Sequence, residues 1–270
     1  MGAGIAQAAA AAGHSVVLFD IDAGSRERGG AAIASSLARI VRKGTMTEAD
    51  AAAVQERVTL ADQLTAIRKA GIVIEAVTEN LDIKRSLWQA AAAEAPETAL
   101  LATNTSSLSV TQIASFSGRP ASFCGLHFFN PVPVLPLVEV VRGELSSQET
   151  IDRAEAFVNG IGKTPLLCND TPGFLVNRLL IPYMNDAVHA LSEGVGTAEQ
   201  IDTAMKLGAN MPIGPLALTD LVGLDVALAA ADSLYAEYQD PKFRVSPLLR
   251  RLVRAGKLGR KSGAGFHDYE

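Results

Sequence analysis

The sequence predicts an α/β protein in which a doubly wound sheet domain is followed by an all-helical domain. Through the first two-thirds of the chain, short β-rich runs alternate with helical stretches, which indicates a mostly parallel sheet covered by helices on both faces. From DTPGFLVNRLL onward every long pattern is helical. We therefore expect one domain over 1–169 and a second over 170–270.

The strands of the first domain are expected at short apolar runs. These runs are SVVLFD, GIVIEAVTE, ALLATNTSS with its exit loop, SFCGLHFFNP, LPLVEVVRG and TPLLCND. Helical periodicity marks the connections IKRSLWQAAAAEA and SQETIDRAEAFVNGIG. Residues 23–62 are long for a crossover and read as helices, so we expect a helical excursion that projects from the sheet.

The second domain is expected to begin with a helix that Thr171 caps and that has Pro172 in its first turn. The further helical patterns are FLVNRLLIPYMNDAVHALSEG, TAEQIDTAMKLG and PLALTDLVGLDVALAAADSLYAEY. The stretch DLVGLDVALAAADSL has too little polar surface for a helical domain that stands alone. We therefore expect a homodimer that forms through this half.

Composition and charge exclude several classes of function. The 270 residues are 48% hydrophobic and 20% charged, with a net charge of −5, which argues against binding to a nucleic-acid backbone. The apolar runs are too short to span a membrane. Cys124 and Cys168 lie far apart and show no metal-binding spacing, so no metal site is expected. No signal peptide is visible, and we expect a cytoplasmic protein with reduced thiols.

The opening MGAGIAQAAAAAGHSVVLFDID resembles part of a dinucleotide-binding turn. Gly2 precedes a helical run, and a strand then ends at Asp20, eighteen residues later. A carboxylate there can accept the ribose hydroxyls and repels a 2′-phosphate, which favours NAD over NADP. Gln7 occupies the position of the third glycine if the fingerprint starts at Gly2. Gly2 and Gly4 are thus flexible residues at a helix end, or Gly2 is the last glycine of the fingerprint.

A histidine and a carboxylate lie in two neighbouring apolar runs. His127 ends the first run, and Glu139 follows twelve residues later inside the next. A carboxylate in an apolar strand is costly to bury without a partner, and histidine is a natural one. The alternative is a hydrogen-bonded core histidine with an outward-facing glutamate.

Polar residues also follow directly on the run ALLAT. Asn104, Thr105, Ser106 and Ser107 are placed where ligands bind in open parallel sheets, although Ser107 or the nearby Ser109 could simply cap the next helix. Farther along, an asparagine at 177 lies inside an apolar helical pattern, where its amide needs either a partner or solvent.

Several long motifs together resemble the L-3-hydroxyacyl-CoA dehydrogenase family, in particular its short bacterial 3-hydroxybutyryl-CoA dehydrogenases. The motifs are NTSSLS, GLHFFNPVP followed by LVEVV, PGFLVNRLL, and GKLGRKSGAGF. The similarity runs in order from Gly2 to the end of the chain. One departure is His267 after Gly265-Phe266, where the family has an aromatic residue, which puts the packing of the tail in question.

The resemblance implies a reaction and four residues that perform it. The reaction is the reversible oxidation of an L-3-hydroxyacyl-CoA, expected to be 3-hydroxybutyryl-CoA, to the 3-ketoacyl-CoA with NAD. His127 would be the catalytic base and Glu139 the carboxylate that orients it. Ser106 and Asn177 would hydrogen-bond the reacting oxygens of the substrate.

The same resemblance implies binding residues on a Rossmann-type domain. Those for the cofactor are Gly2, Asp20, Glu79, Lys84 and Asn104. Contacts with CoA are implied for Ser36 and Lys43 in the helical excursion.

The resemblance also bears on the start of the chain. The family fingerprint reads G-x-G-x-M-G-x-G after an apolar strand, so Met1 and Gly2 would match its end. We expect the first strand and first two glycines, about ten residues, to be missing from this sequence. A start codon assigned at an internal Met would explain this; otherwise cofactor binding would be weak.

Two other functions remain open from the sequence. One is a related hydroxy-acid or sugar-acid dehydrogenase on the same scaffold. The other is a non-catalytic truncated homologue, such as a structural dimer built from the helical domain.

Overall fold

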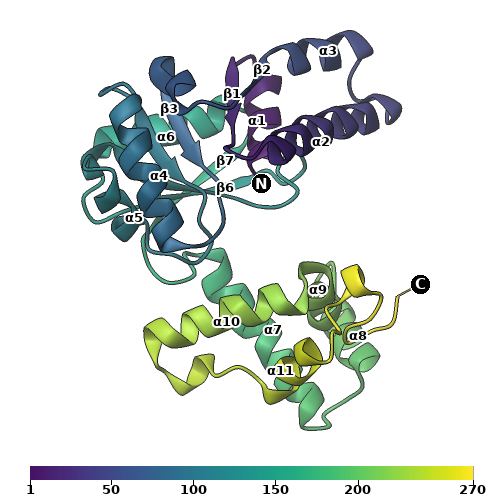
Figure 1. Cartoon of the computed structure of the whole chain (residues 1–270). Helices are drawn as coiled ribbons and strands as arrows, with labels where there is room; N and C mark the ends of the chain where they lie inside the picture. Colours follow the sequence, from purple (N-terminus) through teal and green to yellow (C-terminus); the bar gives the residue numbers. More distant parts are fainter. Residues whose placement is uncertain (270) are drawn as a thin grey trace. The chain divides into compact units, whose positions relative to one another are not determined.

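The computed structural model describes residues 1–269 and divides the chain into two compact units. The first unit covers Met1–Thr171 and combines strands with helices, whereas the second begins at Pro172 and is built from helices (Figure 1). The predicted fold class, an α/β domain followed by a helical one, is confirmed.

The strands of the first unit form two sheets. In the smaller sheet, β1 (Val16–Phe19) pairs in parallel with β2 (Val58–Ala61). The larger sheet has the order β3-β4-β5-β6-β7, and only its β5–β6 pair is antiparallel. Its strands are β3 (Ile72–Glu75), β4 (Leu100–Thr103), β5 (Phe123–Phe128), β6 (Leu137–Arg142) and β7 (Thr164–Asn169).

Most helices of the first unit begin at a polar side chain that accepts a hydrogen bond from a backbone N–H of the first turn, which satisfies an otherwise unpaired donor. The helices capped in this way, with their capping residues, are α2 (Ala23–Arg42; Asp22), α3 (Glu48–Glu56; Thr47), α4 (Leu81–Glu94; Asn80), α5 (Val110–Phe116; Ser109) and α6 (Gln148–Gly160; Ser147). The helix α1 (Gly2–Ala11) starts at Met1 without such a cap.

The region 23–62 is only partly helical. It contains α2 and α3 as expected, but Val58–Ala61 form β2 rather than the end of a helix. All four residues of β2 pair with residues of β1, and tertiary pairing of this kind overrides a local helical pattern. The helical excursion therefore returns to the sheet as a strand.

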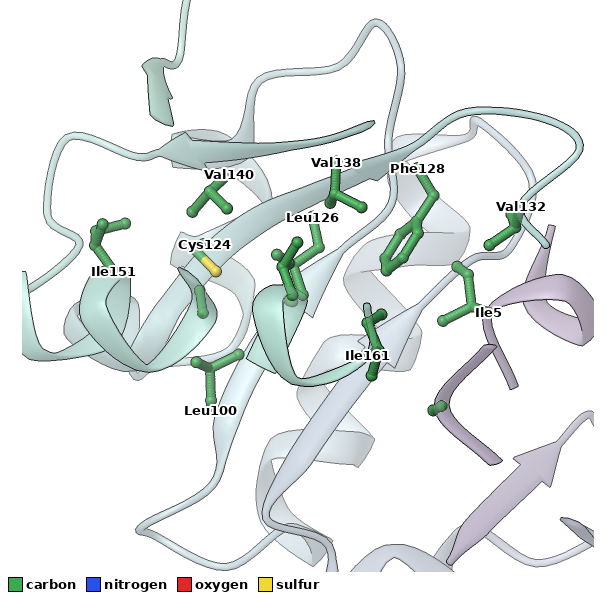
Figure 2. Close-up of a cluster of buried hydrophobic side chains, with 14 residues drawn as sticks. Ile5, Leu100, Cys124, Leu126, Phe128, Val132, Val138, Val140, Ile151 and Ile161 are labelled. Carbon is green, nitrogen blue, oxygen red and sulfur yellow. The ribbon is translucent and has the colours of Figure 1, made fainter. Parts of the chain in front are cut away.

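The core of the first unit lies on one face of the larger sheet, between the sheet and the helices α1 and α6. Side chains of a strand alternate between its faces, and Cys124, Leu126 and Phe128 of β5 all belong to this cluster. Figure 2 shows Leu126 and Phe128 beside Val138 and Val140 of β6. Burial raises the pKa of the Cys124 thiol to about 12.

The opposite face of the larger sheet is covered by α4 and α5. Trp88 of α4 packs edge-on against Phe123 of β5, with ring centroids 4.7 Å apart. The same alternation that sends Leu126 and Phe128 to the core brings His127 to this second face. The sheet is therefore covered on both faces, as predicted.

The second unit consists of helices packed around their own apolar core. They are α7 (Val176–Ser192), α8 (Ala198–Gly208), α9 (Pro215–Val222), α10 (Leu224–Tyr238) and α11 (Pro247–Arg254). The sequence pattern suggests one long helical run through α9 and α10, but Gly223 separates them with a φ of 102°. A conformation of this kind favours glycine because it has no Cβ.

The predicted cap at Thr171 is wrong. The first helix of the second unit, α7, begins at Val176 with Leu175 in the capping position. Gly173 and Phe174 adopt φ values of 80° and 49°, which form a turn and delay the helix by one turn. A Cβ at Gly173 would lie 2.9 Å from the backbone nitrogen of Arg178, so the turn requires glycine there.

The C-terminal tail is held by two buried aspartates. Asp220 accepts hydrogen bonds from the backbone N–H of Phe266, the backbone N–H of His267 and the hydroxyl of Tyr269. The His267 ring contacts Asp202 through Nε2 at 2.8 Å. The histidine that departs from the family pattern thus has a carboxylate partner, and the tail is packed.

Gly125 of β5 allows the sheet and α5 to approach closely. A Cβ there would lie 2.7 Å from the Cβ of Val141 and 2.8 Å from Cγ2 of Val110. We expect Gly125→Ala to lower the free energy of unfolding, measured by urea denaturation, by about 1–3 kcal/mol. Gly160→Ala at the end of α6 is the matched control, because nothing lies within 4 Å of a Cβ at that position. Equal losses in the two variants would contradict this packing account.

Candidate active site

His127 and Glu139 form a buried pair on adjacent strands. They are directly opposite each other in the antiparallel β5–β6 pair, and Nδ1 of His127 lies 2.6 Å from Oε2 of Glu139. Glu139 is fully buried and His127 is 6% exposed. The ring of Phe129 packs against the imidazole, with centroids 4.5 Å apart.

This geometry excludes the alternative of an outward-facing Glu139. A carboxylate without access to water needs a hydrogen-bonded partner, and the imidazole supplies one. The contact at Nδ1 also sets the orientation of the ring, because the imidazole donates from Nδ1 to the carboxylate. The pair can therefore accept a proton at Nε2 and stabilise the resulting imidazolium.

A second polar cluster lies where β3 and β4 end. Glu79, in the segment that follows β3, accepts hydrogen bonds from the backbone N–H of Ser106 at 2.7 Å and from its hydroxyl at 3.1 Å. The hydroxyl of Thr105 donates to both oxygens of the same carboxylate. Ser106 is thus held by Glu79 through both its backbone and its side chain.

Lys84 of α4 is buried beneath this cluster with no exposed surface. Its ammonium lies 2.6 Å from Oε1 of Glu75 and 3.5 Å from Oε2 of Glu79. Glu75 is the last residue of β3, and it also accepts from the hydroxyl of Thr103, its cross-strand partner in β4, at 2.7 Å. The cluster joins two carboxylates through one buried cation.

Asn104 connects the two clusters through the backbone. Its side-chain oxygen accepts from the backbone N–H of Phe128 at 2.9 Å, directly after His127. Its own N–H donates to the carbonyl of Glu75 at 2.7 Å. Asn104 therefore fixes the ends of β3, β4 and β5 relative to one another.

The start of α1 lies close to this edge of the sheets. A Cβ at Gly2 would be 3.9 Å from both Leu18 of β1 and Ala76, which follows β3. Asp20 follows β1, and its carboxylate accepts from the backbone N–H of Asp22 at 2.9 Å. A helix start and a carboxylate at the carboxyl ends of parallel strands are the features that bind a dinucleotide, so these residues fit NAD.

Three further residues expected at the site lie on helices outside these clusters' strands and loops. Ser36 lies on α2, half-buried, and Lys43 is exposed at the end of the same helix. Asn177 is the second residue of α7 and belongs to the second unit.

Sequence reasoning missed two residues of the polar cluster, Glu75 and Thr103, as site residues. Glu75 carried a usable signal, because it is a carboxylate within the apolar run GIVIEAV, just as Glu139 is in LPLVEVV. Thr103 showed no comparable signal, since threonine is common in strands.

Within residues 1–269, no group of three or more His, Cys, Asp or Glu side chains is arranged to hold a metal ion. None of the helices in that range combines the length and apolarity that a bilayer span requires.

Comparison with known proteins identifies both units. Residues 1–171 match the 3-hydroxyacyl-CoA dehydrogenase NAD binding domain, and residues 173–269 match the 3-hydroxyacyl-CoA dehydrogenase C-terminal domain. The chain belongs to the 3-hydroxyacyl-CoA dehydrogenase family. Its first unit is the NAD-binding domain of this NAD-dependent oxidoreductase family.

Relatives of this family match along the whole chain. A probable 3-hydroxybutyryl-CoA dehydrogenase of Bacillus subtilis is 45% identical over 270 residues, which cover 100% of this chain and 94% of that protein. A 3-hydroxybutyryl-CoA dehydrogenase of Clostridioides difficile is 44% identical over 269 residues, covering 100% and 96%. Among solved structures, the (S)-3-hydroxybutyryl-CoA dehydrogenase of Ralstonia eutropha has a TM-score of 0.97 at 45% identity, covering 100% of this chain and 95% of that one.

The buried Lys84 leads to a test of stability. We expect Lys84→Met to lower the free energy of unfolding by about 3–5 kcal/mol, because the charge of Glu75 is then buried without a cation. Urea denaturation followed by circular dichroism measures the loss. Arg85→Met is the matched control, since Arg85 is a neighbouring cation in an exposed pair with Asp82 that contributes only about 0–1 kcal/mol. A similar small loss in both variants would contradict the burial argument.

Proposed function

We propose that this chain catalyses the reversible oxidation of an L-3-hydroxyacyl-CoA, with 3-hydroxybutyryl-CoA as the substrate, to the 3-ketoacyl-CoA. The observation that carries the proposal is the buried His127–Glu139 pair, which supplies an oriented base within an NAD-binding domain. The names of the B. subtilis, C. difficile and R. eutropha relatives support the choice of the four-carbon substrate.

In this proposal His127 is the catalytic base. Its Nε2 takes the proton of the substrate 3-hydroxyl, because Nδ1 is occupied by Glu139. The carboxylate of Glu139 keeps the ring in the required tautomer and stabilises the imidazolium that forms. NAD, when bound, supplies the acceptor for the hydride of C3. In the reverse direction His127 returns the proton to the carbonyl oxygen.

Ser106 and Asn177 are proposed to hydrogen-bond the reacting oxygens of the substrate. The hydroxyl of Ser106 lies at the carboxyl edge of the sheet, where Glu79 holds its position. A hydroxyl that is fixed before the substrate arrives loses little conformational entropy on binding.

The remaining residues are proposed to bind the cofactor and CoA. Asp20 accepts hydrogen bonds from a ribose of NAD, and its charge disfavours a 2′-phosphate. The other residues proposed for NAD are Gly2, Glu79, Lys84 and Asn104, and those proposed for CoA are Ser36 and Lys43. A cytoplasmic, thiol-reducing compartment is part of the same proposal.

The decisive experiment measures NADH oxidation with acetoacetyl-CoA, the 3-ketoacyl-CoA of the proposed substrate. We expect turnover with acetoacetyl-CoA and none with a ketoacid that lacks CoA. We expect His127→Gln to reduce kcat by several orders of magnitude. Loss of acid–base catalysis alone costs roughly 10²–10⁴-fold in rate, and the loss is larger if the ring also orients the substrate. Circular dichroism should show an unchanged fold.

His189→Gln is the matched control for this substitution. His189 lies in α7, where it contacts the carbonyl of Arg244, and it has no part in the proposed chemistry. We expect its kcat to be close to that of the wild type. A near-normal kcat in His127→Gln would exclude this histidine as the base.

We also propose that the chain forms a homodimer through its helical unit. Leu221 and Val222 of α9 and Val226 of α10 are 53%, 38% and 50% exposed, although all three are apolar. Exposed large apolar side chains grouped within a few residues are typical of an interface between subunits.

Sedimentation velocity at micromolar concentration tests the dimer. We expect the wild type to sediment as a dimer and Val226→Glu to sediment as a monomer, because a charge would be buried at the interface. Val195→Glu is the control, since Val195 is 74% exposed in the turn after α7 and lies outside the proposed patch. A monomeric wild type would refute the proposal.

A further inference from the structure

Glu75 lies in the middle of the polar cluster, and its three interactions use both of its oxygens. Oε1 accepts from Lys84 at 2.6 Å and from the backbone N–H of Val77 at 2.8 Å, while Oε2 accepts from the hydroxyl of Thr103 at 2.7 Å. The side chain of Glu75 is 2% exposed and that of Lys84 is fully buried. Neither charge can be compensated by water, so each depends on the other.

The contacts of Lys84 extend this arrangement toward the site. Its ammonium lies between the two carboxylates, 2.6 Å from Oε1 of Glu75 and 3.5 Å from Oε2 of Glu79. The contact with Glu75 is therefore the shorter one. Glu79 is more exposed than Glu75, with 36% of its side chain accessible. Its carboxylate is therefore free to accept from Ser106 and Thr105 while the ammonium remains anchored on Glu75.

We propose that Glu75 is a positioning residue of the active site: it anchors the Lys84 ammonium and thereby fixes Glu79 and Ser106. This inference rests on the proposed roles of Lys84, Glu79 and Ser106. Without Glu75, the lysine has only Glu79 as a carboxylate partner. The ammonium then competes with Ser106 and Thr105 for the oxygens of Glu79, and the hydroxyl of Ser106 loses its fixed position.

Thr103 offers a mild way to disturb Glu75 without changing a charge. Its hydroxyl donates to Oε2 of Glu75 and makes no other hydrogen bond within residues 1–269. Thr103→Val removes this donor and nearly preserves the shape of the side chain. The carboxylate of Glu75 is then less firmly oriented toward Lys84.

Thr150→Val is the matched control for this substitution. Thr150 is also buried in the first unit, at 4% exposure, and its hydroxyl donates to the carbonyl of Ala121 at 2.7 Å. It has no contact with the Glu75 cluster. If Thr103 had only a structural role, the two variants would behave alike.

The experiment measures the dissociation constant of NADH by its fluorescence, together with the melting temperature of each variant. We expect both variants to lose melting temperature, and Thr150→Val at least as much as Thr103→Val, because the Thr150 hydroxyl also accepts from the hydroxyl of Ser147. We expect Thr103→Val alone to weaken NADH binding, by about five-fold, the effect of one hydrogen bond. An unchanged dissociation constant in Thr103→Val, together with a lowered melting temperature, would overturn the proposal.

A second variant, Glu75→Gln, removes the charge but keeps the shape. We expect it to reduce kcat/KM for acetoacetyl-CoA by about a hundred-fold, the scale of a misplaced catalytic group. If this variant does not fold, the comparison of the two threonine variants still decides. If the wild type binds NADH but does not reduce acetoacetyl-CoA, the proposed function fails, while the NADH comparison still tests Glu75.

Discussion

The first unit depends on one constraint: a carboxylate taken out of water within a strand must have a partner with complementary chemistry. The larger sheet contains two such carboxylates, Glu139 in β6 and Glu75 at the end of β3. Glu139 is paired with the imidazole of His127 on the neighbouring strand β5, and Glu75 with the ammonium of Lys84 on α4. These two pairs are buried titratable groups at the candidate active site of the unit.

Strand register places both pairs. The antiparallel turn back from β5 to β6 sets His127 directly opposite Glu139, so the pair needs no long side chain to bridge the gap. Parallel pairing of β3 and β4 similarly sets Glu75 opposite Thr103. The sheet therefore does more than support the loops, because it brings these polar side chains together and excludes water from around them.

The sequence predicted the fold class because it depends on patterns that a single chain displays. For His127 and Glu139 the pattern left two alternatives, and the pairing was implied by the family resemblance. Apolar runs locate strands, and a polar residue inside such a run marks a cost that some partner must offset. The same argument was available for Glu75 but was applied only to Glu139, so its pairing with Lys84 was missed. The roles of the site residues remain predictions.

Other features depended on information that lies outside local patterns. Val58–Ala61 form a strand because they pair with β1. The intrinsic propensity of four residues does not decide between helix and strand. The start of α7 was displaced because Gly173 and Phe174 adopt left-handed conformations, which sequence alone permits at glycine but does not predict at phenylalanine.

The packing around β5 has a consequence for the reactivity of the Cys124 thiol. Cys124 lies three residues before the catalytic-base candidate His127, and burial raises the pKa of its thiol to about 12, which disfavours the thiolate at neutral pH. Peroxides and alkylating agents attack the thiolate. The folded protein therefore holds this thiol, on the face of β5 opposite His127, in its unreactive protonated form.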